Sequence, residues 1–338
     1  MPPDRRATIA GFLGATVVLG VLAYLVGFED LLRSLSMART TVAAGVLLVA
    51  ALWMTAWALA LRTVLGALGA GISRVRATAV YAGVLFANNV TPFGQAGGEP
   101  ISALLISEAA GTEYETALAA IASADSLNFV PSTAIGLVGV TYLSVTVAAG
   151  GRLRWATAAV VALSVALPVL GYLGWRYRER LEAAVVGVVA PLARFVGRHL
   201  PRLEAPTRAA VQNRVDGFFE AIEVVGSDRR TLLAAAGFST LGWLAQAVAL
   251  WLALYAVGEV APVAAVLVAV PVGAIAGVTP LPGGLGGVEA VLVALLVPLA
   301  GVSAATAAAA VVLHRGGIYW LPTLLGGGVV SALGVNRV

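Results

Sequence analysis

The chain has 338 residues, of which 60% are hydrophobic and only 11% charged, and its mean hydropathy is +0.94. Ordinary soluble domains carry roughly 25% charged residues, so water could not solvate the surface of a protein with this composition. These values exclude a soluble catalytic domain. They predict an all-α integral membrane protein, a polytopic helical bundle.

The charged residues and the absence of cysteine narrow the possible ligands. All 21 basic residues are arginines, and they lie in short segments between apolar runs, so we expect the bilayer surface as a partner and no nucleic acid. With no cysteine, disulfides and Cys-ligated metals are excluded, and two separate histidines, His199 and His314, do not make a metal site. We expect no metal and no cofactor.

Four stretches have the length of single spans: Thr8–Gly27, Thr41–Leu61, Trp155–Trp175 and Thr231–Val257. We interpret the first as a membrane helix oriented by the preceding arginines, because its apolar core is too long for a signal peptide and no A-x-A-like cleavage site follows. Polar residues and prolines interrupt two longer stretches, for which we expect broken or strongly tilted helices: Thr116–Ala149 and Ser303–Leu333.

The segment from Arg176 to Arg230 is the one extended polar region, and it contains ten arginines. Apolar residues recur there at helical spacing, at Val211, Val215, Phe218, Phe219 and Ile222. We predict a cytoplasmic amphipathic helix, either a solvated linker packed on the bundle or a site for lipid headgroups. Asp228 is positioned to cap the span that follows.

An internal repeat organises the chain. Val90-Thr91-Pro92 is followed by Gly97-Gly98-Glu99, and 188 residues later Val278-Thr279-Pro280 is followed by a glycine-rich run and Glu289. Both motifs interrupt an apolar stretch, and an interrupted span follows each of them. We therefore predict a single domain, 1–338, with pseudo-repeat halves at about 77–149 and 261–335, each a Pro/Gly-broken hairpin plus a span, joined through about 176–230.

The distribution of arginines predicts the orientation. If each motif folds as a hairpin that returns to its starting side, sixteen arginines lie inside and only Arg33, Arg39, Arg152 and Arg154 lie outside. This places both termini in the cytoplasm of a multi-pass cell-membrane protein. The two hairpins then enter from opposite sides, which is an inverted-topology repeat, either re-entrant or fully spanning.

Charged side chains at membrane depth, and the Pro/Gly breaks beside them, are the candidate substrate-binding residues, because buried charges and unpaired backbone groups need a partner or a cavity. They are Asn89, Pro92, Gly98, Glu99, Asp125, Pro282, Gly283, Gly284, Glu289, His314 and Arg315. Helix N-termini near Glu99 and Val288 would attract phosphate. The alternative is structural: either glutamate caps its own helix, and Arg315 pairs with Asp125 or a carboxylate of the other repeat.

Nucleophilic catalysis is disfavoured, because no sequence rule places a base beside Ser123 or Ser126, and we expect no enzyme activity. The blocks Asn89-Val90-Thr91-Pro92 to Gly97-Gly98-Glu99-Pro100, Pro282-Gly283-Gly284-Leu285-Gly286-Gly287-Val288-Glu289, and His314-Arg315 before Tyr319 resemble the signatures of the lysylphosphatidylglycerol synthase transmembrane, or flippase-like, family. In multiple peptide resistance factors this module flips aminoacylated phospholipids and precedes a soluble transferase domain. The resemblance therefore implies translocation without synthesis.

Two positions depart from the family pattern. Ser102 stands where many relatives carry arginine, and Ala124-Asp125-Ser126 stands near where a Glu-Arg pair is usual, which leaves Arg315 as the expected intramembrane cation. We expect a translocase of phospholipid or polyprenyl-linked lipid headgroups. The alternative is a non-transporting subunit that binds or regulates a separate glycosyl- or aminoacyl-transferase. We also expect Glu289→Gln to abolish translocation with little change in stability.

Overall fold

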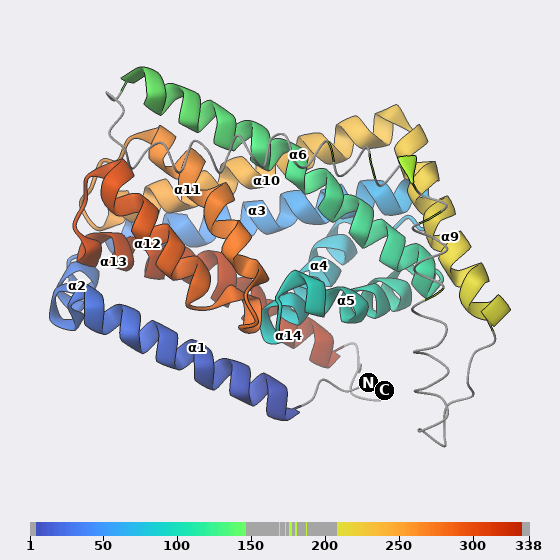
Figure 1. Ribbon diagram of the computed structural model, residues 1–338, viewed down its shortest axis with the longest axis horizontal. Helices are drawn as coiled ribbons and strands as arrows, with labels where there is room; N and C mark the ends of the chain where they lie inside the picture. The colour runs from blue at the N-terminus through green and yellow to red at the C-terminus, as the bar shows by residue number, and fades with distance from the viewer. Residues whose placement is uncertain are drawn as a thin grey trace.

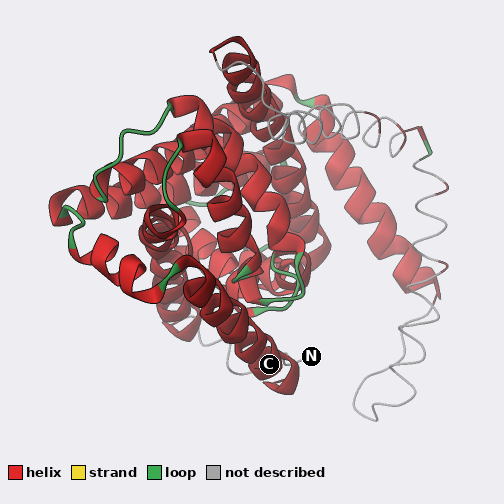
Figure 2. Ribbon diagram, turned by 60° about the vertical axis from the view of Figure 1, so that its left-hand side comes forward, coloured by secondary structure: helices red, strands yellow, loops and turns green. Residues whose placement is uncertain are grey.

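The computed structural model describes residues 5–146 and 208–332, with a few isolated positions between 169 and 187. Within these ranges every regular element is a helix and no strand occurs (Figure 2). Five of these segments are long and apolar enough to cross a membrane: Ile9–Val26, Thr40–Ala67, Tyr114–Leu143, Arg229–Ala256 and Pro282–Ala300. The prediction of an all-α membrane protein is confirmed. The expected span Trp155–Trp175 lies outside the described residues.

Two helices of 28 residues, α3 (Thr40–Ala67) and α10 (Arg229–Ala256), pack side by side through the middle of the bundle (Figure 1). Gly242 of α10 permits the close approach, since a methyl group there would collide with the Trp57 indole. The Trp57 ring also contacts Trp53 and Trp243 edge to face, at centroid distances of 5.3 and 5.5 Å. The predicted spans Thr41–Leu61 and Thr231–Val257 correspond to these two helices.

Two interrupted hairpins pack against this pair. One consists of α4 (Arg74–Val90) and α5 (Gln95–Ala110), and the other of α11 (Val263–Ile275) and α12 (Gly287–Ala300). The four helices have 13 to 17 residues, whereas about 20 are needed to cross a bilayer; Pro282–Ala300 reaches the length of a span because it includes the 3₁₀ turn before α12. Figure 1 shows the hairpins entering the bundle from opposite ends, with their tips meeting in its interior.

A long segment follows each hairpin. After the first, α6 (Tyr114–Thr146) is one continuous helix of 33 residues despite Pro131, so a break in this stretch is not observed. Figure 1 shows that α6 instead crosses the bundle obliquely. After the second, α13 (Ala304–Arg315) passes through a π-helical segment, η3 (Gly316–Trp320), into α14 (Leu321–Ala332). The predicted interruption of this stretch is therefore a π-helical turn, which is a frequent feature of functional sites.

The remaining helices lie at the periphery. Helix α1 (Arg5–Val26) crosses one face, α2 (Phe28–Ser36) follows at one end, and α9 (Arg208–Ser227) packs on α6 near the other end (Figure 1). Helix α9 buries Val215 of the predicted apolar stripe, whereas Asn213, Asp216 and Glu220 on its other side are exposed. Asp228 caps α10 as expected, and hydrogen bonds from the Thr231 hydroxyl and the Arg230 N–H lower the pKa of its carboxyl.

Candidate functional site

The tips of the two hairpins contact each other through glycine. A methyl group added at Gly94 would lie 2.9 Å from the Gly277 carbonyl oxygen, and one added at Gly283 would lie 2.9 Å from the Cα atom of Asn89. Gly94, Gly283, Gly284 and Gly286 all have positive φ. The two Pro/Gly motifs, 188 residues apart in sequence, therefore form one junction, hereafter the glycine junction, and only glycine fits at its closest points.

A buried ion pair lies at the glycine junction. Arg315 Nε donates to Glu289 Oε1 at 2.6 Å, and the second carboxylate oxygen, Oε2, accepts the Gly286 backbone N–H at 2.6 Å. Arg315 also donates from Nη2 to the Gly283 carbonyl at 3.2 Å, so the guanidinium is tied directly to the loop of the second motif. Glu289 is 5% exposed and Arg315 9%. Both charges are therefore removed from solvent and compensated mainly by each other.

Tyr319 links this pair to the first motif. The Arg315 guanidinium carbon lies 4.7 Å from the centre of the Tyr319 ring, and the Tyr319 hydroxyl donates to the Asn89 carbonyl at 2.9 Å. The Asn89 side chain donates in return to the Tyr319 carbonyl at 3.2 Å and to the Thr323 hydroxyl at 2.8 Å. The segment η3–α14 thus connects both motifs, which the residue pattern alone did not reveal.

Helix α1 covers the second motif. A methyl group at Gly11 would lie 2.9 Å from Pro282 Cδ, and one at Gly14 would lie 3.3 Å from Leu281. Ala15 completes this contact as a buried residue packed with Leu285 and Tyr319. A stripe of small residues on α1 therefore lets this helix pack closely over the second motif.

The candidate residues of the first half form a second polar group. Asp125 is buried on α6, and Gln95 and Glu99 of α5 are close enough to act on it electrostatically. A methyl group at Gly98 would collide with Asn88 of α4, so the backbones of α4 and α5 are in close contact here. The expected helix start near Glu99 was wrong, because α5 begins at Gln95 and places Glu99 in its second turn. We call Asn88, Gln95, Gly98, Glu99 and Asp125 the Asp125 cluster.

The remaining candidates are distributed around these two groups. Pro92 and Pro282 lie in the loops at the two tips, where Pro282 is buried and Pro92 partly exposed. His314 is 3% exposed, and neither ring nitrogen has a hydrogen-bond partner. In the described ranges no three His, Cys, Asp or Glu side chains are grouped as metal ligands.

The alternative to substrate binding was that the glutamates cap their own helices and that Arg315 is permanently paired, and the structure shows part of this. Glu289 does cap its own helix, α12, in addition to pairing with Arg315. The partner of Arg315 is the carboxylate of its own half, and a pair between Arg315 and Asp125 or the other half's glutamate is not observed. The expectation of a helix N-terminus near Val288 is correct, since α12 begins at Gly287.

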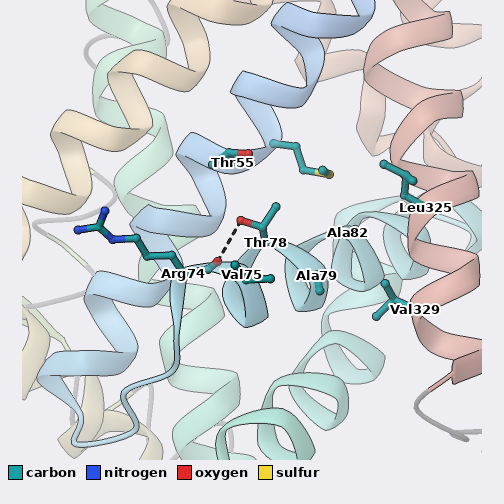
Figure 3. Close-up of a pocket in the computed structure, with 9 residues that line it drawn as sticks. Thr55, Arg74, Val75, Thr78, Ala79, Ala82, Leu325 and Val329 are labelled. Carbon is teal, nitrogen blue, oxygen red and sulfur yellow. Dashed lines mark hydrogen bonds between the residues drawn. The ribbon is translucent and has the colours of Figure 1, made fainter.

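A groove of about 500 Å³ opens on the surface between α3, α4 and α14 (Figure 3). Its lining is mostly apolar, with Arg74 at one end, and consists of Met54, Thr55, Arg74, Val75, Thr78, Ala79, Ala82, Leu325 and Val329. The Thr78 hydroxyl donates to the Arg74 carbonyl at 3.1 Å, which satisfies one polar group of the lining. Val75 and Leu325 are exposed, as expected for side chains that face lipid tails.

The apolar spans, the interrupted hairpins and the buried charges at their junction define a multi-pass membrane protein with a polar site inside its helical bundle. The sequence profile described as lysylphosphatidylglycerol synthase TM region matches residues 9–326, and the chain belongs to this family. A "UPF0104 membrane protein" of Methanothermobacter thermautotrophicus is 28% identical over 334 residues, covering 96% of this chain and 92% of that protein.

Two further relatives carry similar names. A second "UPF0104 membrane protein" of Methanothermobacter thermautotrophicus is 26% identical over 262 residues, covering 74% of this chain and 71% of the relative. The "UPF0104 membrane protein PH1989" of Pyrococcus horikoshii is 24% identical over 322 residues, covering 93% of each chain. The resemblance to this family inferred from the three motifs is therefore confirmed.

Proposed function

We propose that this chain binds the headgroup of a phospholipid or polyprenyl-linked lipid and carries it across the bilayer without chemical change. The observation that carries the proposal is the buried Glu289–Arg315 pair at the glycine junction. A charge in a membrane helix is destabilising by at least about 2.5–3.5 kcal/mol, and intramembrane charges commonly mark substrate pathways. The name of the matched family, which refers to the synthase of an aminoacylated lipid, points to the same class of substrate.

The arrangement of the hairpins suggests how the headgroup would move. The two halves would act as an inverted repeat, whose tips separate first toward one side of the membrane and then toward the other. Arg315, released from Glu289, would bind a headgroup phosphate, and the N-terminus of α12 would add its backbone N–H groups. The headgroup would thereby avoid the desolvation that an unassisted crossing imposes.

The groove between α3, α4 and α14 supports a lipid as the substrate. Its apolar lining suits an acyl or polyprenyl chain, and Arg74 at its end suits an anionic headgroup at the membrane surface. Leu325 and Val329 of the groove belong to α14. The first turn of the same helix contains Thr323, whose hydroxyl accepts a hydrogen bond from the Asn89 side chain at the glycine junction. A lipid tail could therefore remain in this groove while its headgroup reaches the glycine junction.

The test is reconstitution of the purified protein into liposomes with a panel of headgroup-labelled lipids, followed by chemical quenching of the outer leaflet. Wild-type protein should accelerate the loss of protected label for one class of lipid. Arg315→Gln should abolish this acceleration, whereas the matched control Arg33→Gln should retain it, because Arg33 is an exposed residue of α2 paired only with Asp30. Acceleration that is equal for wild type and Arg315→Gln would refute the proposed site.

One observation favours a second candidate, a non-transporting subunit of a separate transferase. The Glu289–Arg315 pair is buried and its two charges satisfy each other, as expected for a scaffold whose polar residues are permanently paired. Liposomes that contain this chain alone distinguish the two functions, since a translocase acts without a partner. If every lipid of the panel remains protected, the scaffold is the better interpretation.

A further inference from the structure

The two halves of the chain carry charged residues at two corresponding positions, and the charges are opposite at one of them. A spacing of 190 residues relates Glu99 to Glu289, and the same spacing relates Asp125 to Arg315. In the second half these positions form the Glu289–Arg315 ion pair. In the first half a glutamate and an aspartate occupy them, so the Asp125 cluster has the carboxylate of the pair and a second carboxylate at the position of the cation.

Asp125 lies inside the bundle without a compensating cation among the described residues. It is 8% exposed, and its Oδ2 atom has no hydrogen-bond partner. Gln95 and Glu99 of α5 and Tyr81 of α4 lie close enough to this carboxylate to act on it electrostatically. A carboxylate that is buried beside a second carboxylate is strongly destabilising unless a cation or a proton neutralises it.

Further oxygen atoms of this contact also lack partners. On α5, Gln95, Gly98, Glu99 and Ser102 recur at positions i, i+3, i+4 and i+7, which places them on one face of the helix. Ser102 is fully buried, and its hydroxyl has no hydrogen-bond partner. Asn88 of α4 packs against Gly98 on the same face, and its Oδ1 atom is likewise unpartnered. Unsatisfied buried oxygens of this kind are rare in native proteins, and a bound water or ion usually satisfies them.

We infer that the Asp125 cluster, together with Ser102, binds one hard cation, coordinated by oxygen atoms of Glu99, Asp125, Asn88 and Ser102. The donor set contains carboxylate, amide and hydroxyl oxygens and no nitrogen or sulfur, which suits alkali and alkaline-earth ions rather than zinc, copper or iron. The bound ion would do in the first half what the Arg315 guanidinium does in the second, because it would neutralise the carboxylates and tie α5 to α6. This inference does not depend on the proposed function, since ion binding can be measured without any lipid.

The test measures thermal unfolding of the purified full-length protein in detergent. Chlorides of Na⁺, K⁺, Mg²⁺ and Ca²⁺ are titrated at constant ionic strength against N-methylglucamine chloride. One of these ions should raise the unfolding temperature of wild type in a saturable manner. Glu99→Gln and Asp125→Asn should each weaken the apparent affinity at least about tenfold, the smallest effect typical of a lost residue at a metal site. The exposed Glu108 of α5 provides a matched control, and Glu108→Gln should respond like wild type.

A reciprocal variant tests the inference through a gain of stability, whereas the variants above test it through a loss of ion binding. Asp125→Arg supplies the cation found at the equivalent position of the second half, and it should raise the unfolding temperature in N-methylglucamine chloride and remove the response to added ions. The inference is overturned if no ion acts on wild type beyond the N-methylglucamine reference. It is equally overturned if the response persists in both Glu99→Gln and Asp125→Asn, or if Asp125→Asn is as stable as ion-saturated wild type, which would mean that Asp125 carries a proton.

Discussion

Replacing Glu289 with glutamine removes the negative charge from the buried ion pair while it keeps a side chain of nearly the same shape. The sequence alone led us to expect a loss of translocation with little change in stability. The structure reverses the second expectation, because Arg315 is 9% exposed and Glu289 is the carboxylate that neutralises it. The substitution leaves a guanidinium buried without its counter-charge.

The size of the effect follows from the contacts. Breaking a buried ion pair by removing one partner destabilises a protein by about 3–5 kcal/mol. Glutamine can still accept the hydrogen bond from the Gly286 N–H, which Glu289 Oε2 accepts at 2.6 Å. We therefore expect Glu289→Gln to lower the free energy of unfolding by about 3 kcal/mol, at the lower end of this range. Glu289→Ala also loses this helix cap, which adds about 1 kcal/mol.

The assay is reversible unfolding in mixed micelles, applied to Glu289→Gln, Arg315→Gln and the double variant. Because the double variant contains no unpaired charge, it should be more stable than the sum of the two single effects predicts, with a coupling energy in the range of about 0.5–3 kcal/mol found for contacting residues. If the single variants are as stable as wild type, or if their effects simply add, the pair does not stabilise the fold and our interpretation of its geometry is wrong.

Three further predictions follow from the packing and the orientation. Gly242→Ala should destabilise the protein by about 1–3 kcal/mol in the same unfolding assay, since it collides with Trp57, whereas Gly237→Ala on the same helix meets open space and should be neutral or stabilising. Gly11→Leu should push α1 away from Pro282 and increase the rate at which a thiol reagent labels Leu285→Cys; unchanged labelling would show that α1 does not cover the junction. In this cysteine-free chain, Asn213→Cys should be labelled from the cytoplasmic side and Met37→Cys from the outer side, and the reverse pattern would overturn the arginine-based orientation.

The fold class and the interrupted hairpins could be predicted because their causes are local. A run of about 20 apolar residues is sufficient to identify a span such as α3, and the prolines and glycines around Pro92 and Pro280 cannot continue a helix. Continuity of α6 could not be predicted, because whether a helix tolerates a proline such as Pro131 depends on the neighbours that satisfy its backbone.

The sequence was sufficient to predict which residues belong to the candidate site, but not which of them contact each other. Glu289 and Arg315 were recognisable because charges are rare in apolar stretches, yet their pairing depends on how α12 and α13 pack, which no spacing rule supplies. Tyr319 was missing from the candidate residues because an aromatic residue in a membrane helix is unremarkable. Its contact with Asn89, 230 residues away, exists only in the folded chain.

The π-helical segment Gly316–Trp320 makes the chain unusually sensitive to changes in length at this point. In an uninterrupted α-helix each residue turns the chain by about 100°, and a π-turn accommodates one residue more than an α-turn. Deleting one residue here would restore a regular helix, but it would rotate Arg315 relative to Thr323 by about a quarter of a turn. Either the ion pair or the bond to Asn89 would then be lost. We therefore expect this single-residue deletion to be as harmful as removing the charged pair itself, although it removes no charge and opens no cavity.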